Sequence, residues 1–503
     1  MKGTVNAADR GTFGDGRGDA GAVTGDCGDI ASTKTATSAR LKPMRFLLLR
    51  SEGLSPLGLP CTLSREPLRR LAPPFDVAQG LPSAVEGRSR GSLRCARSRL
   101  PSRRVLGIET NYIVYIWMFS SRVPEALEPN RLTQTVRRMR AAGTPLLDLT
   151  VTNPTAAGID YPADILDALA DRRSLRYEPA ALGLIEARTA VARDYERLGI
   201  KVAPERVVLT ASTSEAYSIL FKLLCAAHGD AVMLPIPSYP LFEHLTGLDG
   251  VSPIPYRLDF HGRWAIDFDT LDAGWTDTVR GVLAVSPNNP TGSILTASEL
   301  HALVERCASR NAALIIDEVF IDYPISTDVA VPDVARDCLT FRLGGLSKSA
   351  GLPQVKLGWI VVDGPEALAR TALDRLELIC DTYLSVSTPV QHAASALIAA
   401  GAEIRGRILE RVRTNDRTLR RLSAAYPSIE ALPSEAGWSA VLRVPSTRSE
   451  EDLAIALLET AAVVVHPGFF FDFAHEAFLV VSLLPETEVF TEGVRRVMEI
   501  AHA

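Results

Sequence analysis

The sequence has no apolar run long enough to cross a membrane, which takes about 20 residues. The two apolar runs nearest the N-terminus, 46–49 and 112–119, are short, and neither has the charged start and cleavage site of a secretory signal. Cysteine is also scarce, with seven residues in the chain. These cysteines form no CxxC pair and show no metal-ligand spacing. We therefore expect a soluble protein of the reducing cytoplasm that binds neither a metal ion nor a membrane.

Positive charge is in short supply over most of the chain. Residues 1–117 carry 18 Lys and Arg against 10 Asp and Glu, whereas residues 118–503 carry 36 against 49. The net charge is therefore +8 for the first segment and −13 for the remainder, within an overall charge of −5. Binding to a phosphate backbone needs a concentrated basic face, so we expect no nucleic-acid partner for the acidic part.

Residues 1–117 show no persistent helix or strand period. They are rich in Gly and Asp, then interrupted by Pro, and they end in an Arg- and Ser-rich run. Such a composition buries too little apolar surface to offset chain entropy, so disorder is one interpretation. A basic tail that binds nucleic acid or an anionic membrane is a second. We favour a third, that the segment lies upstream of the true start at Met118, because fold-like sequence begins abruptly there.

From Met118 onward, short apolar strands alternate with helices. The predicted strands are 146–149, 207–210, 231–234, 282–285, 313–316 and 339–343, and the predicted helices include 165–170, 185–197 and 215–227. This alternation predicts a largely parallel sheet with helices on both faces, a three-layer α/β/α domain. Long helices and then strands at 440–444, 463–466 and 478–483 predict a smaller α+β domain.

The predicted organisation therefore has three folded parts. Residues 118–155 form an N-terminal arm and the first part of the small domain, residues 156–394 form the large domain, and residues 395–503 complete the small domain.

Two charged residues follow predicted strands of the large domain. Lys348 lies in Ser-Lys-Ser-Ala-Gly-Leu-Pro, and its small neighbours allow a flat ring to approach closely. Asp317 ends the apolar strand 313–316, where a buried carboxylate needs a counter-charge such as a protonated pyridine nitrogen. Each residue alone also fits an ordinary role, as a solvated loop lysine or a turn-capping aspartate.

Three further segments follow other predicted strands. In Ser-Pro-Asn-Asn-Pro-Thr-Gly, two prolines and a glycine make a rigid turn that fixes the amide of Asn289. Ser212-Thr213-Ser214 stands where a strand meets a helix, and a helix N-terminus binds anions such as a phosphate. Tyr239, in Pro-Ser-Tyr-Pro, is placed to stack on a ring. A plain turn, an N-cap and simple packing remain the alternatives for these three segments.

The order of these motifs resembles the pyridoxal-phosphate (PLP) aminotransferases of class I and II. The resemblance rests on Asn-Pro-Thr-Gly, then Asp-Glu-Val-Phe, then Ser-Lys-x-x-Gly-Leu-Pro, and it extends over residues 118–503. It implies the PLP-dependent transferase fold type I, like that of aspartate aminotransferase. It also implies an enzyme that moves an amino group between an amino acid and a 2-oxo acid.

The resemblance also implies a role for each matching residue. Lys348 would hold PLP as a Schiff base and shuttle protons, Asp317 would pair with the pyridinium nitrogen, and Asn289 would bind the 3′-oxygen. Tyr239 would stack on the ring. The phosphate would lie near Thr213, Ser214 and Ser347, and Tyr177 would reach the phosphate of a neighbouring subunit. The implied assembly is a homodimer with two shared active sites.

Two departures from the family pattern affect the cofactor, one at its 3′-oxygen and one, formed by two residues, at its phosphate. Phe320 stands where the family usually has a tyrosine, so the phenol that would bind the 3′-oxygen is absent. Lys356 replaces a common arginine at the phosphate and keeps the charge without the bidentate fork. Gly345 also replaces a frequent serine. We therefore expect PLP to be lost more easily than in relatives.

A third departure affects the substrate. The family arginine that binds the substrate carboxylate aligns with Val480. Arg443, on a neighbouring predicted strand, is a candidate replacement, although a surface arginine fits this pattern as well. Asn153, in a loop near the expected mouth of the site, is a second candidate for substrate binding.

Aminotransfer is the leading hypothesis for the function. Another PLP reaction on the same fold, such as a C–S β-lyase or decarboxylase reaction, is the second hypothesis, and the missing carboxylate arginine favours it. A PLP-fold binding protein without turnover is the third. The presence of both Lys348 and Asp317 argues against a mere binder. The sequence does not identify the amino donor or the acceptor.

Overall fold

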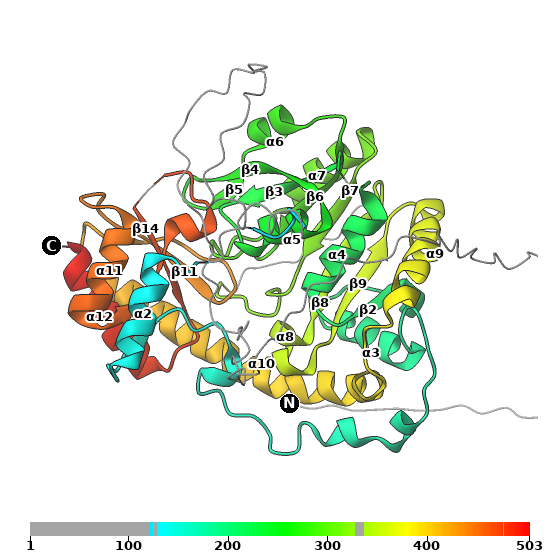
Figure 1. The fold of residues 1–503 in the computed structure, drawn as a ribbon, viewed down its shortest axis with the longest axis horizontal. Coiled ribbons are helices and arrows are strands. Elements are labelled where there is room, and N and C mark those ends of the chain that lie inside the picture. The colour runs from blue at the N-terminus through cyan, green and yellow to red at the C-terminus, as the bar shows by residue number, and fades with distance from the viewer. Residues whose placement is uncertain (1–119, 125–127, 227, 327–335, 476, 503) are drawn as a thin grey trace, which may run out of the picture. The chain divides into compact units, whose positions relative to one another are not determined.

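The structure, a computed structural model, describes residues 120–124, 128–226, 228–326, 336–475 and 477–502 (Figure 1). The expectations for residues 1–117 and for a start at Met118 lie outside these described residues. Within the described ranges, no helix has both the length and the apolar character that crossing a membrane would take.

An eight-stranded sheet forms the centre of the large domain (Figure 1). Its strand order is β2-β9-β8-β7-β6-β3-β4-β5. The bounds are β2 Val207–Thr210, β3 Ala231–Ile236, β4 Ser252–Phe260, β5 Trp264–Ile266, β6 Val279–Val285, β7 Ala313–Asp317, β8 Thr340–Gly345 and β9 Gly358–Asp363. The consecutive strands β8, β7, β6, β3 and β4 pair in parallel, whereas β9 is antiparallel to both of its neighbours and β5 is antiparallel to β4. The prediction of a mainly parallel sheet is confirmed.

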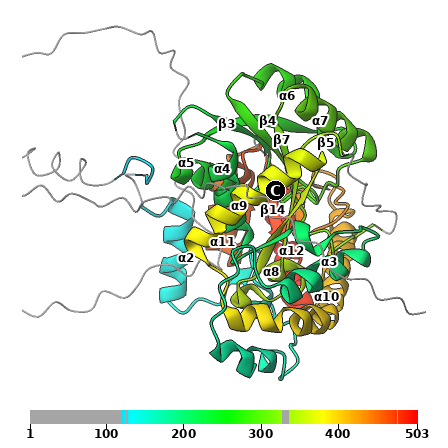
Figure 2. The ribbon, with the colours of Figure 1, turned by 90° about the vertical axis from the view of Figure 1, so that its right-hand side faces the viewer.

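Both faces of this sheet are buried, which explains why its strands are continuous apolar runs rather than alternating ones. In β7, Ile315 faces one apolar cluster, and Leu314 and Ile316 face another. The first cluster includes α4 Thr213–Leu224, α5 Leu241–Asp249 and α9 Glu366–Tyr383. The second includes α3 Ile185–Glu196, α6 Phe268–Gly274, α7 Ala297–Ser309 and α10 Thr388–Ser423. Figure 2 shows α5 and α7 on opposite sides of the sheet.

A second, four-stranded sheet of order β10-β11-β14-β13 belongs to the smaller domain. Its strands are β10 Glu430–Ala431, β11 Ser439–Arg443, β13 His466–Pro467 and β14 Phe478–Ser482. A separate pair joins β1 Leu147–Asp148 to β12 Val463–Val464. The helices of this domain are α2 Arg131–Ala141, α11 Glu450–Ala461 and α12 Thr487–His502. Segments from early and late in the described chain therefore pack together, as the pairing of β1 with β12 shows.

Several expected elements differ in the structure. The segment expected as a helix at 165–170 forms only a 3₁₀ turn, Asp167–Ala170, and the expected strand 463–466 is divided into β12 and β13. The expected domain boundary at 394/395 falls inside the continuous helix α10. Strand β4 was not predicted, because Pro253 and Pro255 argue against a strand at this place in the sequence. In the structure both prolines pair with β3 alone, so the other edge of β4 needs no N–H from them.

A buried ion pair links the two central strands β7 and β8. Arg342 of β8 donates to both carboxylate oxygens of Glu318, at 3.0 and 2.7 Å, and both side chains are 5% exposed. Glu318 directly follows Asp317. This contact makes Glu318 a structural residue that fixes the end of β7.

Glu318→Ala should destabilise the fold strongly, because it leaves the guanidinium of Arg342 buried without its carboxylate. We expect a loss of about 3–5 kcal/mol in the free energy of unfolding, measured by urea denaturation. Glu430→Ala, which removes the partner of the half-exposed Arg443, is the matched control and should lose less than about 1 kcal/mol. Equal losses in the two variants would contradict the structural role of Glu318.

Candidate functional site

Five sequence-predicted segments converge at one edge of the large sheet. Strands β3, β6, β7 and β8 are adjacent and parallel, and β2 runs in the same direction because β9 is antiparallel to both β2 and β8. Their carboxyl ends lead into Tyr239, Asn289, Asp317, Lys348 and Ser212. The carboxyl edge of a parallel α/β sheet is where ligands bind in such folds.

Asp317 is a buried carboxyl group, 6% exposed, at the end of β7. Its Oδ2 accepts a hydrogen bond from the hydroxyl of Tyr217, and its Oδ1 accepts one from the backbone N–H of Val319 at 3.0 Å. Burial raises its pKa to about 6, although both hydrogen bonds and the charge of Lys348 oppose this rise. A cation beside Asp317 would relieve the cost of burying its charge.

Lys348 lies in the short helix α8, Leu346–Ser349, next to β8. Its Nζ is 4.9 Å from the centroid of the Trp438 ring and 5.6 Å from that of Phe320. Burial lowers its pKa to about 8, while the negative charge of Asp317 acts in the opposite direction. A fraction of the amine is therefore neutral near pH 7, as a nucleophile or base requires.

Three aromatic residues that the sequence analysis did not single out support this pair. Tyr217, on the buried face of α4, donates to Asp317, and the hydroxyl of Tyr323 donates to the carbonyl of Lys348. Trp438, 1% exposed, packs edge-on against Tyr323. A buried tyrosine hydroxyl needs a partner, so Tyr217 within an apolar helix was an available signal. Trp438 and Tyr323 gave no signal beyond their aromatic character.

Asn289 is held by a neighbouring hydroxyl. Its Oδ1 accepts a hydrogen bond from Ser439 at the start of β11, at 3.1 Å. The adjacent Asn288 locks the turn instead, since its Nδ2 donates to the carbonyl of Pro237 at 3.0 Å and to Thr291 Oγ1 at 2.9 Å. The turn therefore frees Asn289 for the site and links it to the small domain.

The N-terminus of α4 has the features of an anion site. Ser212 is the N-cap, and its hydroxyl accepts from the backbone N–H of Glu215 at 3.2 Å. Thr213 and Ser214 form the first turn. A Cβ on Gly358 of β9 would lie 2.9 Å from the carbonyl carbon of Ser212 and 3.1 Å from the nitrogen of Thr213. The glycine therefore lets β9 approach the end of the helix closely.

Tyr239, Ser347 and Lys356 surround the same edge. The ring of Tyr239 is 40% exposed and packs edge-on against Phe242 at 6.0 Å. Partial burial and then the charge of Asp317 raise its pKa to about 12. Ser347 is half-buried beside Lys348, and Lys356 is exposed with a left-handed backbone at φ 59°. The carbonyl of the next residue, Leu357, accepts a hydrogen bond from the backbone N–H of Leu346, and this bond joins the turn to α8.

The two candidate substrate-binding residues have other partners. Arg443 pairs with Glu430 on β10 and is half-exposed. Four residues of strand separate Arg443 from Ser439, a distance of about 13 Å. Asn153 accepts from the backbone N–H and hydroxyl of Thr155, at 3.1 and 2.8 Å. Neither contact joins the group around Lys348, and a role of Arg443 or Asn153 in substrate binding stays a prediction.

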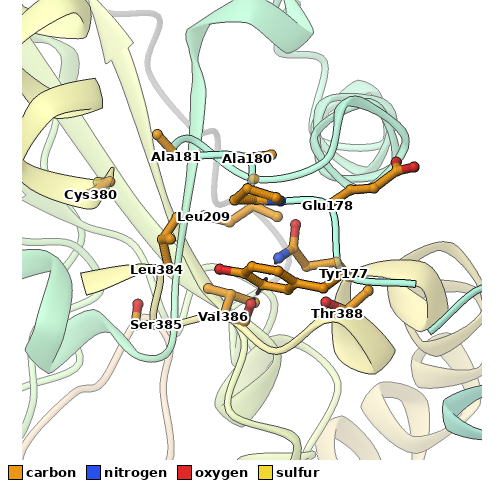
Figure 3. Close-up of a pocket in the computed structure, with 13 residues that line it drawn as sticks. Tyr177, Glu178, Ala180, Ala181, Leu209, Cys380, Leu384, Ser385, Val386 and Thr388 are labelled. Atoms are coloured by element: carbon orange, nitrogen blue, oxygen red, sulfur yellow. Dashed lines mark hydrogen bonds between the residues drawn. The ribbon is translucent and has the colours of Figure 1, made fainter. Parts of the chain in front are cut away.

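Tyr177 lies at a different place on the surface. Its side chain is 69% exposed and lines a shallow pocket between the 177–183 segment and the end of α9. Figure 3 shows its ring lying across this pocket near Val386 and Thr388. The pocket is lined by neither Asp317 nor Lys348.

The arrangement suits PLP in its charges and shape. The buried carboxyl of Asp317 would be relieved by a pyridinium nitrogen, Lys348 offers a partly neutral amine, and the start of α4 presents backbone N–H groups and hydroxyls to a phosphate. No group of three or more His, Cys, Asp or Glu side chains suited to a metal ion was found among the described residues.

Comparison with known proteins agrees with the geometry. A family model described as "Aminotransferase class I and II" matches residues 144–497. The chain is 29% identical over 261 residues to the glutamate-pyruvate aminotransferase AlaA of Escherichia coli strain K12, covering 51% of this chain and 64% of that one, so it spans just under two thirds of that relative. It is 27% identical over 308 residues to an alanine aminotransferase of Mycobacterium tuberculosis strain H37Rv, covering 60% and 70%.

Solved structures show the same fold. An alanine aminotransferase from Pyrococcus furiosus aligns with a TM-score of 0.67 and 21% identity, covering 73% of this chain and 95% of that one. An aspartate aminotransferase from Thermotoga maritima aligns with a TM-score of 0.66 and 20% identity, covering 76% and 100%. The expected fold type I is confirmed.

Tyr217→Phe should raise the pKa of Asp317 further, because it removes a hydrogen bond to the ionised carboxylate. With a folded pKa near 6 and an ordinary value of 3.8, the cofactor-free protein should lose stability as the pH rises from about 4 to 6. In the variant this loss should continue to higher pH. Urea unfolding between pH 4 and 8, with and without Asp317→Asn, measures it.

Tyr256→Phe is the matched control, because the buried hydroxyl of Tyr256 donates to the carbonyl of Leu283 and to no carboxylate. It should lower stability by a similar amount at every pH. A Tyr217→Phe profile parallel to that of the control would show that the phenol does not govern Asp317.

Proposed function

The chain belongs to the class I and II aminotransferase family, and from this premise we propose that it transfers an amino group between an amino acid and a 2-oxo acid with PLP. The observation that carries the proposal is the pair formed by Asp317 and Lys348. Their pKa values are shifted toward each other by burial, to about 6 and about 8, at the ends of adjacent strands. Opposite shifts of this kind are typical of catalytic acids and bases.

PLP supplies an electrophilic carbon and a ring that accepts electrons from the substrate. In our proposal, Lys348 would hold the cofactor through its Nζ, and the same amine would take up and return the proton of the substrate Cα. Asp317 keeps a proton on the ring nitrogen, with Tyr217 and Val319 orienting its carboxylate. Asn289 binds the 3′-oxygen, positioned by Ser439.

The remaining residues hold and shield the cofactor. The backbone N–H groups and hydroxyls at the start of α4, Thr213 and Ser214, bind the phosphate together with Ser347 and Lys356. Tyr239 covers one face of the ring. Phe320 contributes no hydroxyl and is 8% exposed, so it excludes water from the space beside Lys348.

A panel of amino donors tests the function. The names of the relatives make L-alanine and L-glutamate the first donors to try. We expect at least one donor to convert the bound cofactor to its pyridoxamine form, seen by absorbance, and a 2-oxo acid to reverse the change. Lys348→Ala should bind PLP without this turnover, losing at least about 10³-fold in rate, because the proton-transferring amine is gone.

Other outcomes would identify the alternatives. Release of ammonia and a keto acid with PLP retained would indicate a β-lyase, and release of CO₂ would indicate a decarboxylase. Binding of PLP without any donor-dependent spectral change would indicate a binding protein. Each of these results contradicts aminotransfer.

We also propose a homodimer with shared sites. Leu175, Tyr177 and Tyr383 are large apolar or aromatic side chains exposed by 83%, 69% and 54% at or beside the Tyr177 pocket. A second copy of the chain would cover this surface, and Tyr177 would then reach the phosphate of the partner subunit.

The four cysteines of the described residues are all free thiols, which supports a cytoplasmic location.

Tyr177→Phe tests the shared site. Sedimentation equilibrium should give twice the chain mass for both wild type and variant. The variant should bind PLP about 5- to 10-fold more weakly by equilibrium dialysis, because one hydrogen bond to the phosphate is lost. Tyr383→Phe, at the same surface, is the control and should bind PLP as wild type does. A monomer with unchanged PLP affinity in the Tyr177 variant would refute the shared site.

A further inference from the structure

Trp438 has a buried hydrogen-bond donor without an acceptor. The side chain is 1% exposed, and its Nε1 has no partner among the described residues. An indole N–H can only donate, and buried donors are rarely left unpaired because the loss of hydration costs free energy. An orphan donor in an active site is therefore a candidate for ligand binding.

The indole borders the reacting amine. Lys348 Nζ lies 4.9 Å from its ring centroid. Edge-on contacts with Phe320 at 5.3 Å and Tyr323 at 5.0 Å fix the plane of the ring. The next residue is Ser439, which holds Asn289. If Lys348 Nζ handles the proton of the substrate Cα, as proposed above, the carboxylate attached to that carbon would lie near this ring.

The position where the family arginine would bind the substrate carboxylate is apolar. Val480 is 2% exposed, and its cross-strand neighbours are Val441 and His466. Burial lowers the pKa of His466 to about 4, with Asp148 acting in the opposite direction, so the imidazole is neutral at pH 7. His466 therefore does not restore the missing charge.

Three arginines near these segments have other partners. Their contacts are Arg443 with Glu430, Arg263 with Glu435, and Arg413 with the carbonyl of Pro324. The charged partner expected at position 480 is thus not replaced by any of these three side chains.

On the basis of the proposed aminotransferase function, we infer that the Nε1–H of Trp438 donates a hydrogen bond to the carboxylate of the substrate, in place of the ion pair with arginine. The ligand class is an amino acid or 2-oxo acid whose carboxylate lies beside Lys348. A single neutral donor fixes one carboxylate oxygen without the second hydrogen bond or the charge of a guanidinium. Binding should consequently depend little on salt.

Trp438→Phe removes the donor and keeps an aromatic ring. We expect KM for the amino donor to rise about 10-fold while kcat stays within about twofold, because a contact made equally in the ground and transition states is lost. An unchanged KM overturns the inference. A shift in the absorbance titration of the bound cofactor with unchanged KM also overturns it, since the N–H would then bind the cofactor's 3′-oxygen.

Trp264→Phe is the matched control. Trp264 is also buried, and its Nε1 also lacks a partner among the described residues. It lies in β5, five strand positions from β8, or roughly 24 Å along the sheet. Its loss should leave the KM for the amino donor unchanged.

Nuclear magnetic resonance of ¹⁵N-indole groups tests the contact in the wild-type holoenzyme. The chain has five tryptophans, so single Trp→Phe variants assign the five indole signals. If Trp438→Phe does not fold, the variants at the other four tryptophans assign its signal by elimination. Adding propionate, a carboxylate without an amino group, should move the Trp438 Nε1–H proton signal downfield and leave that of Trp264 in place. A Trp438 signal that stays fixed at saturating propionate overturns the inference.

The two proposals fail in different ways. If no donor is transaminated but propionate moves the Trp438 signal, the carboxylate contact stands and aminotransfer fails. If transamination occurs while the Trp438 signal and the KM of Trp438→Phe are unchanged, aminotransfer stands and the contact fails.

Discussion

The site depends on two ionisable groups that follow the ends of neighbouring strands and lose hydration there. Asp317 and Lys348 each resist their charged form because of burial, and each is stabilised in that form by the other. This balance brings the pKa values of both groups within about one unit of pH 7, where each exchanges protons readily. The parallel pairing of β7 and β8 maintains this arrangement, because the register that pairs Asp317 with Leu343 holds the carboxyl ends of the two strands side by side.

The surrounding polar contacts orient this pair. Tyr217 and Val319 hold the carboxylate of Asp317, and Tyr323 holds the backbone of Lys348. Glu318 is turned away by its ion pair with Arg342, so two successive acids have separate tasks. The polar groups of the site are thus fixed by the large sheet and its helices.

Phe320, one of the departures from the family pattern, belongs to a connected aromatic group beside Lys348. Phe320 and Trp438 both face the amine of Lys348, and Trp438 also contacts Tyr323. The loss of a hydroxyl at Phe320 and of a positive charge at Val480 makes the site more apolar than the family pattern implies. The small domain contributes to this group through Trp438 and to the polar side through Ser439, which holds Asn289.

The sequence by itself determined the parallel strands and the residues that follow them. Continuous apolar runs with Asp317, Asn289 and Lys348 at their ends predict one sheet edge, because the carboxyl ends of parallel strands meet there. Contacts between residues far apart in sequence could not be predicted, since nothing local couples Tyr217 to Asp317 or Trp438 to Lys348. Only the tertiary structure decided that Arg443 pairs with Glu430 and that a buried indole with an unpaired N–H packs against Lys348, because both depend on how distant strands and loops pack.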